Sequence, residues 1–226
     1  MIRARLGPAH TTAAAASQGR GCSTAFILPP LVVLLFGAGM LAFAPDSRTS
    51  TLALAPAGNP DSPQLSRIYA PSVLYWTSSI LRWAASEGLD PNLVAVVMQI
   101  ESCGDPFARS SAGALGLFQV MPYHFLPTDD PYAPDTNAVR GMDYLKHSLA
   151  AADNDIHLGL AGYNGGIGLM SQLELFWPTE TVRYACWGSG IYQDAVSGAA
   201  VSGRLDEWLA AGGASLCARA RQRLQL

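Results

Sequence analysis

Apolar positions recur at intervals of three and four residues through most of the chain after residue 70, the spacing of one face of an α-helix. Proline or an acidic residue opens several of these stretches, and glycine closes some of them. Strand signals are nearly absent, apart from a short hairpin expected near 110–116. The pattern predicts an all-α domain of about six or seven helices. They are expected at 71–87, 91–102, 135–151 with Asp135 as its cap, 156–163, 180–195, 202–211 and 214–224.

A different pattern precedes this domain. Residues 23–44 form an apolar stretch without a charge, and roughly 20 such residues span a bilayer core. The arginines upstream predict that the N-terminus stays in the cytoplasm and that the rest is exported. An uncleaved anchor and a cleaved signal peptide both fit, since 42–44 has the form of a cleavage site but Pro45 disfavours cleavage. Four segments are expected: a cytoplasmic or n-region at 1–22, a transmembrane signal anchor or signal peptide at 23–44, a flexible linker at 45–65 and the helical domain at 66–226. The helical domain is expected in the cell envelope on the extracytoplasmic side, where it is either membrane-anchored or secreted.

Composition and charge limit the classes of molecule that the chain is expected to bind. The 226 residues carry a formal charge of −3 and no run of Lys or Arg, which argues against a nucleic-acid partner. The exported part holds Cys103, Cys186 and Cys217, so one disulfide and one odd thiol are expected. Their spacing does not resemble a zinc site. The sequence predicts neither a metal nor a cofactor.

Glu101 is the first candidate for chemistry. Val94, Val97 and Met98 lie seven, four and three residues before it, so its carboxyl shares the apolar face of the helix. Desolvation and the negative end of the helix dipole should both raise its pKa. A carboxyl group that stays protonated near neutral pH can act as a general acid. The alternative is that Glu101 is exposed or bonded to nearby backbone.

Two later stretches add polar groups suited to a cleft. The Ser- and Gly-rich stretch 110–116 can turn tightly, and Gln119 follows it inside an apolar run. Tyr163 and Asn164 stand at a helix end beside two glycines. The simpler alternatives are that Gln119 ties down a loop, that Met121 is core and that Asn164 is an ordinary helix cap.

The order of these motifs resembles the soluble lytic transglycosylase (SLT) domain of the goose-type lysozyme superfamily. The matching stretches are "ESCGDPFARSSAGALGLFQVMP", "DPYAPDTNAVRGMDYL", "LAGYNGG" and the shorter "PTETVRYA". The match as a whole covers roughly 91–184. The resemblance implies a lysozyme-like α fold and cleavage of the MurNAc–GlcNAc β-1,4 bond of peptidoglycan glycan strands, without a metal or cofactor. It implies Glu101 as the catalytic acid and base, and as substrate-binding residues Ser102, Gln119, Met121, Tyr163, Asn164 and Glu180.

The acidic residues bear on the mechanism. Most glycosidases need two carboxylates, but Asp105, Asp129, Asp130 and Asp135 are best explained as turns and caps. A single acid fits a lytic transglycosylase, which closes a 1,6-anhydro ring. The alternatives are a muramidase of the same fold, in which water attacks, and a cell-wall-binding module without catalysis. Outside the motifs, Trp187 is expected in the core, and a Cys103–Cys217 bridge is one hypothesis because it would tie the last helix to the loop behind Glu101.

Overall fold

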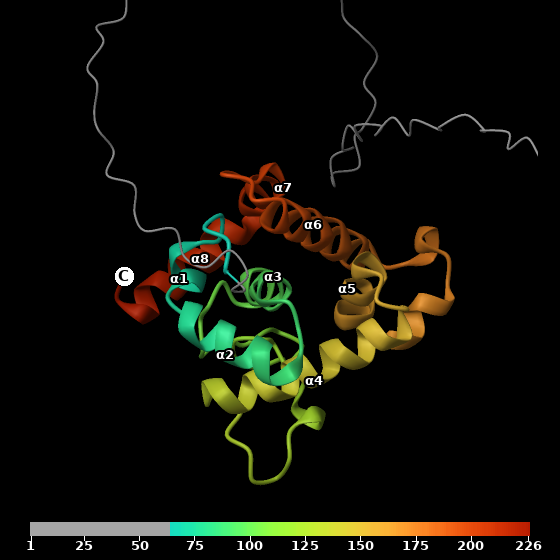
Figure 1. The fold of residues 1–226 in the computed structure, drawn as a ribbon. Coiled ribbons are helices and arrows are strands. Elements are labelled where there is room, and N and C mark those ends of the chain that lie inside the picture. Colours follow the sequence, from blue (N-terminus) through green and yellow to red (C-terminus); the bar gives the residue numbers. More distant parts are fainter. Residues whose placement is uncertain (1–63) are drawn as a thin grey trace, which may run out of the picture.

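The computed structural model describes residues 64–226, and this part of the chain is an all-α domain (Figure 1). The predicted membrane segment at 23–44 lies outside the described residues. Within 64–226, no helix is long and apolar enough to cross a membrane. The elements are α1 Pro71–Leu74, α2 Thr77–Glu87, α3 Pro91–Glu101, η1 Pro122–His124, α4 Pro134–Ala151, α5 Ile156–Gly165, η2 Ile167–Ser171, η3 Glu174–Phe176, α6 Thr179–Val196, α7 Gly203–Trp208, η4 Leu209–Gly213 and α8 Ala214–Leu224.

Helix α3 forms the centre of the domain. Figure 1 shows it end-on, with α2 and α4 on one side, α6 on the other, and α5 and α8 at its flanks. Its residues from Pro91 to Gln99 are all buried, as a helix that is apolar on every face requires. The Asp90 side chain caps its start by accepting the Asn92 N–H at 2.7 Å, as the sequence predicts. Glu101 is the last residue of this helix, so a well-packed element fixes its position.

The structure corrects two predictions about helix starts. The expected helix 71–87 divides into α1 and α2, because the Trp76 indole N–H donates to the Gly104 carbonyl at 2.9 Å and its ring stacks on Trp83. Asp135 does not cap α4, because the capping position is Ala133. The Asp135 carboxylate instead accepts the Trp83 indole N–H at 2.6 Å. Both differences thus coincide with contacts of a tryptophan: Trp76 lies between α1 and α2, and Trp83 lies in α2.

The side-chain amide of Asn137 holds the loop between α3 and α4 through three hydrogen bonds. The Asn137 side chain donates to the carbonyls of Leu115 and Pro131 at 2.8 and 2.9 Å and accepts the Phe118 N–H at 2.8 Å. Gly116 has φ +75°, and a Cβ there would collide with the Asn137 amide. The expected hairpin is present as two isolated antiparallel bridges, Arg109–Leu115 and Leu115–Val120.

A disulfide joins Cys103 to Cys217, across 114 residues of sequence. It fastens α8 behind the end of α3, two residues after Glu101, which is the pairing that the sequence suggested. The buried Gln99 amide nitrogen lies 3.2 Å from the Cys103 sulfur. The expected odd thiol is not found, because no cysteine within 64–226 is free.

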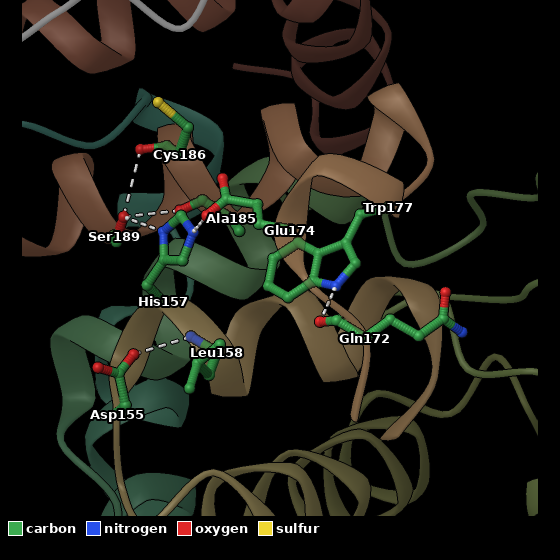
Figure 2. Close-up of polar contacts among 9 residues, drawn as sticks. All are labelled: Asp155, His157, Leu158, Gln172, Glu174, Trp177, Ala185, Cys186 and Ser189. Atoms are coloured by element: carbon green, nitrogen blue, oxygen red, sulfur yellow. Dashed lines mark hydrogen bonds and ion pairs between the residues drawn. The ribbon is translucent and has the colours of Figure 1, made fainter. Parts of the chain in front are cut away.

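The segment from η2 to the start of α6 is braced by His157 of α5 (Figure 2). The Glu174 carboxylate lies 3.5 Å from His157 Nε2, and the Trp177 ring stacks against the imidazole. The Trp177 indole N–H donates to the Gln172 carbonyl at 3.1 Å. Because Glu180 follows this braced turn in the first turn of α6, the brace sets where that carboxylate lies.

Candidate active site

A cleft of about 500 Å³ opens between the loop after α3, helix α4, the end of α5 and the start of α6. It is the place where the separate sequence motifs meet. Of the seven residues that the sequence proposed for catalysis or substrate binding, six line it. Its walls are formed by Glu101, Ser110, Ser111, Ala112, Ala114, Gln119, Val120, Met121, Tyr123, His124, Gly141, Tyr144, Tyr163, Asn164, Gly165, Gly166 and Glu180.

Glu101 reaches the cleft from the carboxyl end of α3. The residue is partly accessible, but protein surrounds most of its carboxyl group. This burial raises the pKa of Glu101 to about 8, because a charged carboxylate is poorly solvated there. The carboxyl is therefore protonated at neutral pH and can donate a proton to a group bound in the cleft.

Two neighbours act on Glu101 in opposite directions. The hydroxyl of Tyr184, on α6, can donate to the carboxylate and lowers its pKa, whereas the negative charge of Glu180 raises it. The Tyr184 contact falls short of a well-formed hydrogen bond, and this buried hydroxyl has no other partner in the described part of the chain. Both effects are smaller than that of burial.

Tyr163 and Asn164 come to the cleft from the end of α5. The Tyr163 hydroxyl donates to the Phe118 carbonyl at 2.7 Å, and the Asn164 side-chain oxygen accepts from the Thr181 hydroxyl at 2.8 Å. Burial, and then the nearby Glu101, raise the pKa of Tyr163 well above its usual value, so it stays a neutral phenol. Asn164 also lines the cleft.

Gln119 and Met121 line the same cleft from the loop after α3. The Gln119 amide nitrogen donates to the carbonyls of Gly116 and Ala108 at 2.9 and 3.2 Å, so it does tie down the loop while lining the cleft. Its φ of +46° is uncommon for a residue with a side chain, and such backbone often accompanies a functional site. Met121 is half-buried and offers an apolar contact.

The structure contradicts the expected role of Ser102 as a sugar contact. Ser102 is fully buried and does not line the cleft. Its hydroxyl donates to the Leu117 carbonyl at 2.7 Å and accepts the Gly104 N–H at 3.0 Å. The hydroxyl fastens the cleft loop to the end of α3, so Ser102 supports the site from behind.

The aspartates outside the cleft have structural partners, as expected from the sequence. Asp105 accepts the Phe107 N–H at 2.9 Å, and Asp130 accepts the Tyr132 N–H at 3.0 Å. Asp129 accepts from Arg140 Nε at 2.7 Å. Trp187 packs against the core and does not line the cleft, as expected.

Four aromatic residues at the site were not predicted from the sequence. Tyr123, His124 and Tyr144 line the cleft, and Tyr184 lies beside the acid. Tyr184 belongs to the stretch "ETVRY", in which only Glu180 had been given a role. The ring contacts of the other three cross from η1 to α4, and no local pattern in the sequence indicates that pairing.

A Ser–His–Glu cluster also occurs away from the cleft (Figure 2). His157 Nδ1 lies 3.4 Å from the Ser189 hydroxyl, and Glu174 lies at the other ring nitrogen. The Ser189 hydroxyl donates to the Ala185 carbonyl at 2.7 Å, in the middle of α6. This hydroxyl is engaged by its own helix, so the cluster acts as a brace. Within 64–226 there is also no group of His, Cys, Asp and Glu that could hold a metal ion.

Part of the chain is similar to known proteins. Residues 78–174 match the family model described as "Transglycosylase SLT domain". A transglycosylase of Enterobacteria phage PRD1 is 38% identical over 113 residues, which are 49% of this chain and 40% of that protein. The chain therefore matches less than half the length of this curated relative.

Two solved structures are similar at lower identity. One is an inactive mutant of the lytic transglycosylase Slt from Pseudomonas aeruginosa, with 20% identity and a TM-score of 0.41. The other is the 70 kDa soluble lytic transglycosylase from Escherichia coli, with 18% identity and a TM-score of 0.41. Each similarity covers 66% of this chain and 24% of the other. Residues 78–174, the segment that includes Glu101, are therefore similar to a transglycosylase SLT domain, and part of the chain is similar to the phage transglycosylase.

Proposed function

We propose that the chain is a peptidoglycan lytic transglycosylase, which cleaves the MurNAc–GlcNAc β-1,4 bond and forms 1,6-anhydro-MurNAc. The observation that carries the proposal is the position of the Glu101 carboxyl, which lines the cleft at the end of α3 and is surrounded by protein, so that burial raises its pKa to about 8. The family match supports the substrate class, since the family is named for transglycosylase activity. The substrate would be the glycan strand of the cell wall.

In this mechanism Glu101 acts twice. It first donates its proton to the glycosidic oxygen, and the bond from C1 of MurNAc to that oxygen breaks. The N-acetyl group of the same sugar stabilises the positive charge that develops at C1. The Glu101 carboxylate then takes the proton of the MurNAc 6-hydroxyl, whose oxygen bonds to C1. The cycle consumes no water and leaves Glu101 protonated.

The neighbouring residues have defined parts in this cycle. Tyr184 can donate a hydrogen bond to the carboxylate once Glu101 has lost its proton, because its hydroxyl has no other partner in the described residues. Gln119, Met121, Tyr163 and Asn164 would hold the sugars on either side of the bond. Ser102 is left out of this set because it is buried behind the loop.

A muramidase remains the second candidate because Glu180 lies in the same cleft. An exposed carboxylate there could activate a water molecule, which the hydrolytic route needs. The products separate the two routes. Digestion of purified sacculi followed by mass spectrometry should give anhydro ends under the proposal, whereas reducing ends, heavier by one water molecule, would establish the muramidase.

Location follows from the substrate. Peptidoglycan lies outside the cytoplasmic membrane, and the Cys103–Cys217 disulfide fits an oxidising compartment. We therefore place the domain on the extracytoplasmic side of the cell envelope, anchored or secreted through residues 23–44. Fractionation of cells that carry the full chain, with detection of the domain in membrane and soluble extracts, tests this placement.

A further inference from the structure

A series of four rings runs along one wall of the cleft. The ring of Tyr123 lies 4.6 Å from that of His124, His124 lies 4.7 Å from Tyr144, and Tyr144 lies 5.7 Å from Tyr163. All four residues line the cleft. The series therefore leads from Tyr163, which is electrostatically coupled to Glu101, to Tyr123 at the rim.

Tyr123 is unusually open for a large aromatic side chain, since 75% of it is exposed. Its backbone is nevertheless fixed: the His124 N–H donates to the Met121 carbonyl at 3.0 Å, and the Phe125 N–H donates to the Pro122 carbonyl at 3.2 Å. Phe125 packs against the core. A short helix thus anchors one aromatic residue inward and holds another outward at the edge of the cleft.

A single exposed aromatic residue needs no explanation in a soluble protein. Tyr123 differs because it continues an existing row of rings that ends beside the acid. Phenol and imidazole rings combine an apolar face with a polar edge, which suits a ligand with the same two properties. A pyranose ring has an apolar C–H face and polar hydroxyls, so a sugar can stack on such rings.

The charges of the cleft agree with a sugar ligand. Among the described residues that line it, the charged side chains are Glu101 and Glu180, and no Lys or Arg is present. Because no Lys or Arg lines it, the cleft has little positive charge to attract an anion, and a protonated Glu101 adds no charge of its own. A neutral, N-acetylated saccharide fits this surface.

We propose that Tyr123 and His124, with Tyr144 behind them, form an additional saccharide subsite that extends the cleft beyond the sugars at the cleaved bond. Its ligand is a unit of a β-1,4-linked N-acetylated amino-sugar polymer. This inference rests on the proposed function and deepens it, because it makes cleavage depend on glycan length. Tyr123 and His124 then determine specificity without taking part in proton transfer.

Binding to the catalytically disabled Glu101→Gln protein tests the subsite apart from the chemistry. Isothermal titration with N-acetylchitooligosaccharides from disaccharide to hexasaccharide should show affinity that rises with length. Adding Tyr123→Ala should lower the affinity for the hexasaccharide about tenfold and leave that for the disaccharide unchanged, since the lost contact is one buried aromatic face. Tyr123→Trp should restore the length dependence.

The controls separate a subsite from a general effect on folding. Tyr75→Ala removes another exposed tyrosine, outside the cleft, and should leave all affinities unchanged. In otherwise unaltered protein, Tyr123→Ala should raise the KM for long glycan strands and leave kcat unchanged. The subsite is refuted if Tyr123→Ala changes no affinity, if it lowers all lengths equally, or if no oligosaccharide binds. None of these results bears on whether the products carry anhydro ends, which decides the proposed function.

Discussion

The hydroxyl of Tyr184 and the carboxyl of Glu101 are buried side by side, and the hydroxyl has no other hydrogen-bond partner within the described residues. Because a phenol donates more strongly to a carboxylate than to a carboxylic acid, this pair is best satisfied after Glu101 has given up its proton. The relationship between these two residues gives the first prediction.

Tyr184→Phe should raise the pKa of Glu101 further, since the hydroxyl lowers it in the intact protein. The alkaline limb of the pH profile of kcat/KM, expected near pH 8, should move to higher pH. The variant should keep its thermal stability, because it removes a buried polar group without a well-formed partner. Initial rates on sacculi between pH 5 and 10 provide the measurement. An unchanged or lower alkaline limb would show that Tyr184 does not donate to the carboxylate.

Glu101→Gln should abolish most of the activity and increase the stability. We expect a loss of roughly 10²–10⁴-fold in rate, the usual contribution of a general acid. The pKa of about 8 in the folded state exceeds the ordinary glutamate value of 4.5, so the stabilising effect of the protonated acid is complete below about pH 4.5 and is lost as pH rises through 8. The neutral amide avoids this loss.

Thermal melts test the second half of that prediction. The Tm of Glu101→Gln should exceed that of the unaltered protein at pH 8, and the difference should shrink toward pH 4. Glu180→Gln is the matched control, because Glu180 is exposed and its own substitution should change Tm little. A difference in Tm that does not vary with pH would argue against a raised pKa in the folded state.

Ser102→Ala should act on stability and not on substrate binding. The substitution leaves the buried Leu117 carbonyl and Gly104 N–H without their partner, a loss of about 1–3 kcal/mol in the free energy of unfolding. Urea denaturation and KM on glycan strands measure the two effects. Ser111→Ala, at an exposed position that lines the cleft, should leave stability unchanged. A higher KM for Ser102→Ala at full stability would return Ser102 to the sugar contacts.

Removal of the Cys103–Cys217 disulfide should lower the free energy of unfolding by about 2–5 kcal/mol, as expected for a long closed loop. Cys217→Ala paired with Cys103→Ala is the variant, and denaturation under non-reducing conditions is the measurement. The acid lies two residues from Cys103, so the rate on sacculi should also fall at temperatures where the unaltered protein is still stable. Stability equal to that of the unaltered protein would refute this contribution.

Local sequence patterns predicted the helices well, because the start of a helix and its apolar face are both encoded by residues that are close together in the sequence. The Asp90–Pro91 start and the apolar face before Glu101 gave α3 and the environment of the acid correctly. The same reasoning failed at α1 and α2, where Trp76 reaches a carbonyl 28 residues away. Contacts between residues so far apart in the sequence depend on the whole fold, and the spacing of apolar residues along a helix does not predict them.

In the candidate site, too, local motifs predicted some residues, whereas contacts made only in the folded chain were not predicted. Gln119, Met121, Tyr163 and Asn164 were found through their motif, and they line the cleft. Ser102 was misplaced because the motif does not state whether the side chain after the acid points into the cleft or into the loop. The row from Tyr123 to Tyr144 was missed because it joins η1 to α4, and only the folded chain brings those rings together.

The Cys103–Cys217 disulfide, which joins α8 to the end of α3, limits how far the chain can be shortened from its C-terminus. The family match stops at residue 174, before Glu180, Tyr184 and Cys217. A fragment trimmed to the matched segment would keep the acid but lose the residues that tune it and the covalent tie that secures its helix. An engineered minimal enzyme should therefore retain the chain at least as far as Cys217.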